Sequence, residues 1–129
     1  MSVQYVVEVP GLPRPKGHYS YAVVQNGQVS TAGLLPIGED GQAINGEIEE
    51  EARCVLHHLR NVLSASGSDL HHLVKVTVYI SDVSLWARFN AVYAEVLGEA
   101  RPARTVVPVP ELHYGCKLEI EATAIIRAW

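Results

Sequence analysis

The last third of the chain reads Arg101-Pro102-Ala103-Arg104-Thr105-Val106-Val107-Pro108-Val109 and, a few residues later, Lys117-Leu118-Glu119-Ile120-Glu121-Ala122-Thr123-Ala124. Thr and Val dominate the first run, and apolar residues alternate with polar or charged ones in the second, so both predict β-strands. Side chains two residues apart in a strand point the same way, so Glu119 and Glu121 share one face. We expect these two strands to be neighbours in one sheet, so that Arg104 and these carboxylates form either a site for a small anionic substrate or an ordinary salt bridge on a solvated face.

We place these two strands at about 104–109 and 117–127. In the rest of the chain, hydrophobic periodicity predicts six further elements. They are strands at 4–9, 19–25, 28–32 and 73–80, and helices at 47–66 and 85–97. Asn26-Gly27 predicts a type I′ hairpin turn, since both central residues of that turn need positive φ. Ser84 is the expected cap of the second helix, because a serine hydroxyl accepts from backbone N–H groups at a helix start.

This element order predicts an α+β fold in which both helices cover one face of a single mixed sheet. At 129 residues the chain fits one domain spanning 1–129. The other face of the sheet still carries substantial side chains, since Leu118, Ile120 and Ala122 alternate with Glu119, Glu121 and Thr123. Such a face is usually covered by oligomerisation.

The composition bounds the class of protein. The net charge is −4 and the ten basic residues are scattered, whereas a nucleic-acid surface usually clusters Lys and Arg, so we expect no nucleic-acid partner. Two cysteines, Cys54 and Cys116, are too few for the disulfide framework of a small secreted protein. No signal-peptide pattern and no apolar run of membrane-spanning length are visible, so we expect a reduced, cytoplasmic protein without membrane contact.

Four residues carry candidate chemistry. The Arg104 guanidinium is a rigid fork of donors that suits a carboxylate. Glu119 is a candidate base that positions a water. Tyr19 offers either a phenol donor or an apolar wall, or else it is simply a core or interface aromatic. Asn90, in the second helix, either reaches a site or serves a structural role.

The sequence predicts neither a metal site nor a bound cofactor. The pairs His57-His58 and His71-His72 are adjacent, so their side chains point apart, and no zinc-type spacing with Cys or Asp accompanies them. The chain has no glycine-rich phosphate loop, no GxSxG elbow and no recognisable Cys-His pair.

Four segments together resemble the RidA (YjgF/YER057c/UK114) family over nearly the whole chain. They are Val74-Lys75-Val76-Thr77-Val78-Tyr79-Ile80, Phe89-Asn90-Ala91-Val92-Tyr93, Pro102-Ala103-Arg104-Thr105-Val106-Val107 and Lys117-Leu118-Glu119-Ile120-Glu121-Ala122. Gly17-His18-Tyr19 and Ser30-Thr31-Ala32-Gly33 fall where that family has its Gly-Pro-Tyr and Thr-Ser-Gly segments. The resemblance implies a chorismate-mutase-like α+β fold and a homotrimer, with a central barrel of sheets, helices outside and clefts between subunits.

The activity that the resemblance implies is hydrolytic deamination of reactive enamines and imines. Substrates such as 2-aminoacrylate and its imine tautomer would yield a 2-oxo acid and ammonia, without a cofactor. Carried over to this chain, Arg104 would clamp the substrate carboxylate and Glu119 would position the water. Tyr19 and Asn90 would line the cleft, and Ala32, Gly33 and Val106 would contact the ligand, with backbone donors near Gly33 and Val106.

Several positions depart from the family pattern. Val106 stands where many deaminating members have a cysteine, Ala32 where a serine is frequent and Leu34 where a glutamine is common. The loop from Pro13 to His18 is also more basic, and its role is open. These changes leave three alternatives to deamination of 2-aminoacrylate-like imines. The protein is a deaminase of a larger catabolic intermediate such as 2-aminomuconate, a trimer that binds a small carboxylate without turnover, or an RNA-cleaving protein. The acidic net charge argues against the last of these.

Overall fold

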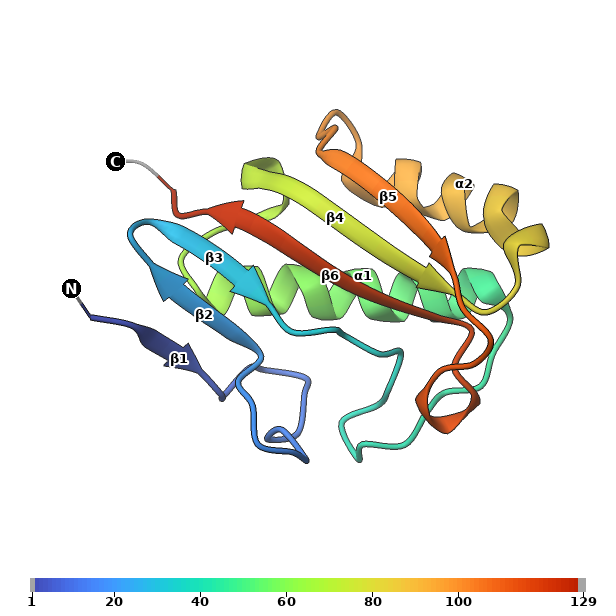
Figure 1. Cartoon of the computed structure of the whole chain (residues 1–129), viewed down its shortest axis with the longest axis horizontal. Coiled ribbons are helices and arrows are strands. Elements are labelled where there is room, and N and C mark those ends of the chain that lie inside the picture. The colour runs from blue at the N-terminus through green and yellow to red at the C-terminus, as the bar shows by residue number, and fades with distance from the viewer. Residues whose placement is uncertain (1, 128–129) are drawn as a thin grey trace.

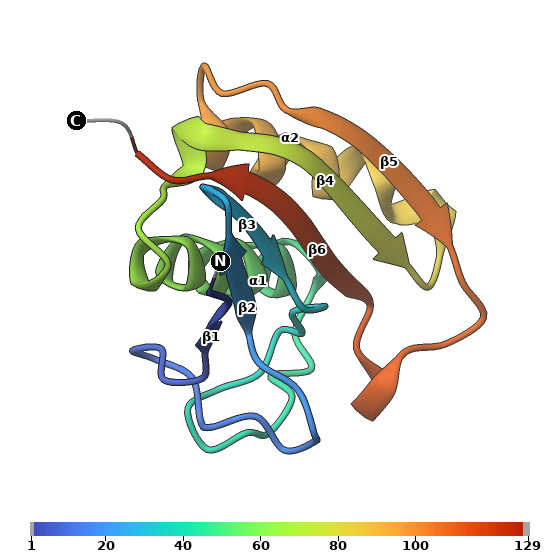
Figure 2. The ribbon, with the colours of Figure 1, turned by 60° about the vertical axis from the view of Figure 1, so that its left-hand side comes forward.

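The computed structural model describes residues 2–127, which form one six-stranded sheet with both helices on one of its faces (Figure 1). The strands are β1 (Gln4–Val6), β2 (Ala22–Gln25), β3 (Gln28–Thr31), β4 (Leu73–Ile80), β5 (Ala103–Pro108) and β6 (Leu118–Ile125), and the helices are α1 (Ile48–Ala65) and α2 (Trp86–Leu97). Turned by 60°, the molecule shows the other face of the sheet free of helices (Figure 2). The predicted α+β fold and its element order are confirmed.

The strands follow the order β1-β2-β3-β6-β4-β5, in which only β4 and β5 run parallel. Parallel neighbours need a long crossover, and α2 supplies it. The expected pairing of the last two strands is wrong, because β4 lies between β5 and β6. The hairpin between β2 and β3 is confirmed, with positive φ at both Asn26 and Gly27.

The core lies between the helices and the sheet. The apolar stripe of α1 is wholly buried and consists of Ile48, Ala52, Val55, Leu56, Leu59, Val62 and Leu63. On α2, Phe89 is fully buried, and its ring centroid lies 5.5 Å from that of Tyr93. Val76, Val78 and Ile80 of β4 meet them from the sheet. Val74 of the same strand is exposed, at the point where the register against β6 shifts between Leu73 and Lys75.

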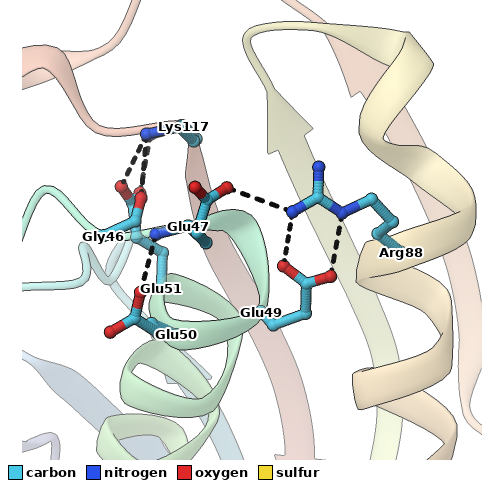
Figure 3. A network of polar contacts seen from close by, with 7 residues as sticks. All are labelled: Gly46, Glu47, Glu49, Glu50, Glu51, Arg88 and Lys117. Atoms are coloured by element: carbon cyan, nitrogen blue, oxygen red, sulfur yellow. Dashed lines mark hydrogen bonds and ion pairs between the residues drawn. The ribbon is translucent and has the colours of Figure 1, made fainter.

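Polar contacts fix the N-terminal end of α1 against both α2 and β6 (Figure 3). Glu47 and Glu50 form a capping box, and Arg88 of α2 pairs with Glu47 and Glu49. Glu51 is fully buried, and its carboxylate accepts from the Lys117 backbone N–H at 2.8 Å, directly before β6. The Glu51 contact thus ties the chain at the start of β6 to α1.

The predicted cap at Ser84 is wrong. The Ser84 backbone N–H and hydroxyl both donate to the Asp82 carboxylate, which caps a short 3₁₀ turn (Val83–Leu85) instead. The first residue of α2 follows this turn directly, and Leu85 at its N-cap offers no side-chain acceptor. Among residues 2–127, no helix has the length and apolar character needed to cross a membrane.

Candidate functional site

A pocket of about 450 Å³ lies at the end of the sheet where several loops gather. The residues that line it come from the loop before β2, from the chain after β3, from a 3₁₀ turn before β6 and from β6 itself; they are Pro13, Lys16, Gly17, Tyr19, Tyr21, Ala32, Gly33, Leu35, Ile37, Gly41, His113, Tyr114 and Glu119. Figure 1 shows these loops together at the lower end of the molecule. The pocket therefore unites four of the predicted site residues: Tyr19, Ala32, Gly33 and Glu119.

Glu119 is the acidic residue of this pocket. It lies on the face of β6 opposite the buried Leu118 and Ile120, and it is itself partly buried. Desolvation raises the pKa of the Glu119 carboxyl above its usual value, His113 partly opposes that rise, and the nearby Glu121 adds to it. A carboxylate with a raised pKa is a stronger base, which is the property that a proton-accepting group needs.

Gly33 makes room for this carboxylate. A Cβ built on Gly33 would lie 3.0 Å from Glu119 Cδ and would overlap its Oε2. Only glycine lets the carboxyl group occupy this position against the backbone. The sequence placed Gly33 near the site only by resemblance, whereas the structure supplies the steric reason.

Tyrosines form one wall of the pocket. The Tyr19 ring is about half exposed and lies edge-on to Tyr21 at 6.2 Å. The Tyr21 hydroxyl donates to the Pro13 carbonyl at 2.7 Å, and the Tyr21 carbonyl accepts from the Ala32 N–H at 2.8 Å. Tyr19 thus faces the pocket on a loop that Tyr21 ties to the rest of the site.

Arg104 lies elsewhere. It is in register with the buried Val76 of β4, and its side chain packs on α2, with the guanidinium carbon 4.6 Å from the Tyr93 ring centroid and 5.9 Å from that of Trp86. One guanidinium nitrogen donates to Asn90 Oδ1 at 2.9 Å. Asn90 therefore orients the arginine. Val106, two residues on, shares this face and packs against the core.

Within one chain, Arg104 and Glu119 do not meet. Arg104 is on the helix-covered side of the sheet and Glu119 is on the open side, with β4 between their strands. None of the ion pairs formed within residues 2–127 involves either residue, so the expected salt bridge is absent there. The prediction that they share one surface of neighbouring strands is wrong. The predicted site residues therefore fall into two groups, one around Arg104 and one around Glu119.

The pocket residues that the sequence did not predict as site residues include Lys16, His113 and Tyr114. Lys16 was noted only as part of a basic loop, and His113 and Tyr114 carried no signal at all. Tyr114 reaches the pocket through a left-handed backbone conformation, with φ of 61°. Neither hydrophobic periodicity nor a motif reports such a conformation. Among the described residues 2–127, no three His, Cys, Asp or Glu side chains cluster as metal ligands would.

These features define a small two-layer α+β protein with a pocket at one end of its sheet. The chain belongs to the Endoribonuclease L-PSP family, whose model matches residues 11–126. This match confirms the family resemblance drawn from the sequence.

Relatives in several organisms support the assignment. The chain is 38% identical over 120 residues to RutC family protein PH0854 of Pyrococcus horikoshii, covering 92% of this chain and 95% of that protein. It is 36% identical over 115 residues to Protein HMF1 of Saccharomyces cerevisiae, covering 89% of each. Among solved structures, E. coli TdcF with bound serine superposes with a TM-score of 0.88 at 29% identity, covering 97% of this chain and all of that one.

Proposed function

We propose that this protein hydrolyses reactive imines and enamines of the 2-aminoacrylate type to 2-oxo acids and ammonia. The observation that carries the proposal is the Glu119 carboxylate, partly desolvated, with a raised pKa, and held against Gly33 in a pocket of about 450 Å³. An iminium carbon is already electrophilic, so a protein needs only to bind the substrate, orient one water and move protons. The serine bound to the related TdcF supports a pocket for small amino-acid-like ligands.

The reaction requires water and no cofactor. Glu119 orients the water and accepts its proton as the oxygen attacks the iminium carbon, which gives a carbinolamine. Glu119 then returns the proton to nitrogen, the C–N bond breaks as the carbonyl forms, and Glu119 takes the hydroxyl proton and passes it to the departing ammonia, which leaves as ammonium. Arg104 holds the substrate carboxylate with the guanidinium donors that Asn90 does not occupy.

We propose further that two subunits of a homotrimer complete each site. Arg104 and Glu119 lie on opposite faces of one sheet, so a substrate that contacts both must lie between copies of the chain. No helix covers the open face of the sheet, which leaves a surface for such an assembly (Figure 2). By the alternation along β4 and β6, this face carries Thr77, Tyr79, Glu121 and Thr123. The Tyr79 hydroxyl, which donates to Glu121, joins the two strands across this face.

A coupled assay tests the activity. An amino-acid oxidase generates imino acids in situ, and semicarbazide trapping reports how fast they hydrolyse. We expect acceleration by the wild type, loss of carboxylate binding and of activity in Arg104→Ala, and slower hydrolysis with binding retained in Glu119→Gln. Acceleration that survives in Arg104→Ala would remove the proposed site. Binding of the 2-oxo acid without acceleration of any imine would favour the alternative of a carboxylate-binding trimer.

Subunit mixing tests the shared site. Arg104→Ala and Glu119→Gln chains, unfolded together in equal amounts and refolded, should regain activity in about one quarter of the sites, because such a site takes its intact Arg104 and intact Glu119 from different chains. Either variant refolded alone is the control. No recovery on mixing, or a monomer by light scattering at micromolar concentration, would contradict the inter-subunit site.

A further inference from the structure

The basic loop before β2 places one cation in the Glu119 pocket, and the hydrolysis proposed above does not use it. Lys16 lines this pocket, and its Nζ donates to the Gly41 carbonyl at 2.9 Å. The same Nζ lies 5.4 Å from the centroid of the Tyr114 ring, which also lines the pocket. The ammonium group is thus held by two pocket residues from two different segments.

Two unusual backbone positions support this placement. Gly41 has φ of 80°, and a Cβ there would lie 2.7 Å from Lys16 Cε and 2.8 Å from Nζ. Only glycine therefore permits both the turn and the approach of the lysine. Tyr114 has φ of 61°, a conformation that is costly for a bulky side chain and that tends to occur at functional sites.

The ammonium group keeps unused capacity. A lysine has three N–H donors, and one of them is spent on Gly41. Arg14, in the same loop, pairs with Glu8, but within residues 2–127 no carboxylate lies within 4.0 Å of Lys16 Nζ. The pocket thus presents a positioned cation that, within residues 2–127, forms no ion pair and has two N–H donors without a hydrogen-bond partner.

We infer that Lys16 recognises a second, distal anionic group on the substrate, so that the preferred substrates are imines of dicarboxylic amino acids. This inference rests on the proposed function, in which Arg104 of a neighbouring copy takes the carboxylate next to the imine. Lys16 then takes the carboxylate at the far end of the side chain, and Glu119 serves the imine carbon. For the glutamate-derived imine, the iminium ion, which carries two carboxylates and one positive nitrogen, and one water give the 2-oxoglutarate dianion and ammonium, which conserves both atoms and charge.

The kinetic test compares two imines of equal carbon number. A glutamate oxidase supplies the glutamate-derived imine, and an L-amino-acid oxidase supplies the norvaline-derived imine, which ends in a methyl group. We expect the wild type to favour the dicarboxylic imine in kcat/KM by about 5–10-fold, and Lys16→Met to lower that ratio to near one. The ratio should also shrink as salt is added, because the contact lies near solvent.

Arg14→Met is the matched control, because it removes a charge from the same loop but outside the pocket. It should leave the ratio of the two rates unchanged. A wild type that prefers the norvaline-derived imine overturns the inference. So does a Lys16→Met variant that changes both rates equally, since Lys16 would then only tie the loop to Gly41.

A binding measurement separates this inference from the proposed function. By calorimetry, 2-oxoglutarate should bind the wild type about 5–10-fold more tightly than 2-oxovalerate, and Lys16→Met should remove the difference. Absence of turnover with both imines, together with this binding difference, would refute the hydrolysis and keep the anion site. Equal binding of the two 2-oxo acids would refute the anion site and leave the hydrolysis intact.

Discussion

Substituting Gly33 by alanine tests the central geometric claim, that glycine makes room for the Glu119 carboxylate. The new Cβ would lie 3.0 Å from Glu119 Cδ, whereas carbon atoms in contact prefer about 3.5–4.0 Å. The carboxyl group must therefore retreat by roughly 0.5–1 Å, and a misplacement of about 1 Å can cost about 100-fold in rate, or about 2.7 kcal/mol of transition-state stabilisation. The backbone at Gly33 lies outside the left-handed region, so the fold should tolerate alanine.

The assay is imine hydrolysis by Gly33→Ala in the wild-type and Glu119→Gln backgrounds. We expect Gly33→Ala to lower the rate of imine hydrolysis about 100-fold in the wild-type background and to lower it little further in the Glu119→Gln background. The effects of two substitutions are not additive when one residue acts through the other. Gly38→Ala is the control, since it adds a methyl group near Asp40 in a loop position that does not line the pocket. Full activity in Gly33→Ala, or equal losses in the two backgrounds, would refute the reasoning.

Three further predictions concern stability. Because folding raises the pKa of Glu119, the protonated carboxyl contributes to stability at low pH, and this contribution is lost as the pH rises through the folded-state pKa. Glu119→Gln should therefore raise Tm near pH 7 but not near about pH 4. A Tm below that of the wild type at both pH values would contradict the desolvation of Glu119. Glu51→Ala leaves the Lys117 N–H and ammonium without their carboxylate and should cost about 3–5 kcal/mol in urea unfolding, so a loss below about 1 kcal/mol would show that this contact is dispensable. Phe89→Ala empties a fully buried position and should cost about 3–5 kcal/mol by the same method, whereas a near-neutral result would mean that α2 repacks around the cavity.

The sequence predicted the elements and most of their faces because these depend on near neighbours. The apolar period of α1 and the alternation in β4 and β6 report burial directly, and Asn26-Gly27 specifies its turn. The predicted ends of the strands were less accurate. The strand predicted at 4–9 stops at Val6, and the strand predicted at 19–25 begins only at Ala22, because backbone pairing, not composition, defines where a strand ends. Side-chain chemistry and the family resemblance together supplied the candidate residues, but neither predicted how these residues are arranged in space.

By itself, then, the sequence determined the secondary structure, the α+β class, the family and the identity of Arg104 and Glu119 as candidates. Only the tertiary structure decided that β4 separates β5 from β6, and therefore that these two residues face opposite sides of the sheet. It also decided that Gly33 touches Glu119 and that Lys16 reaches Gly41. The physical reason is that strand order, register and contacts between distant loops arise from packing across the whole chain, which a local pattern does not encode.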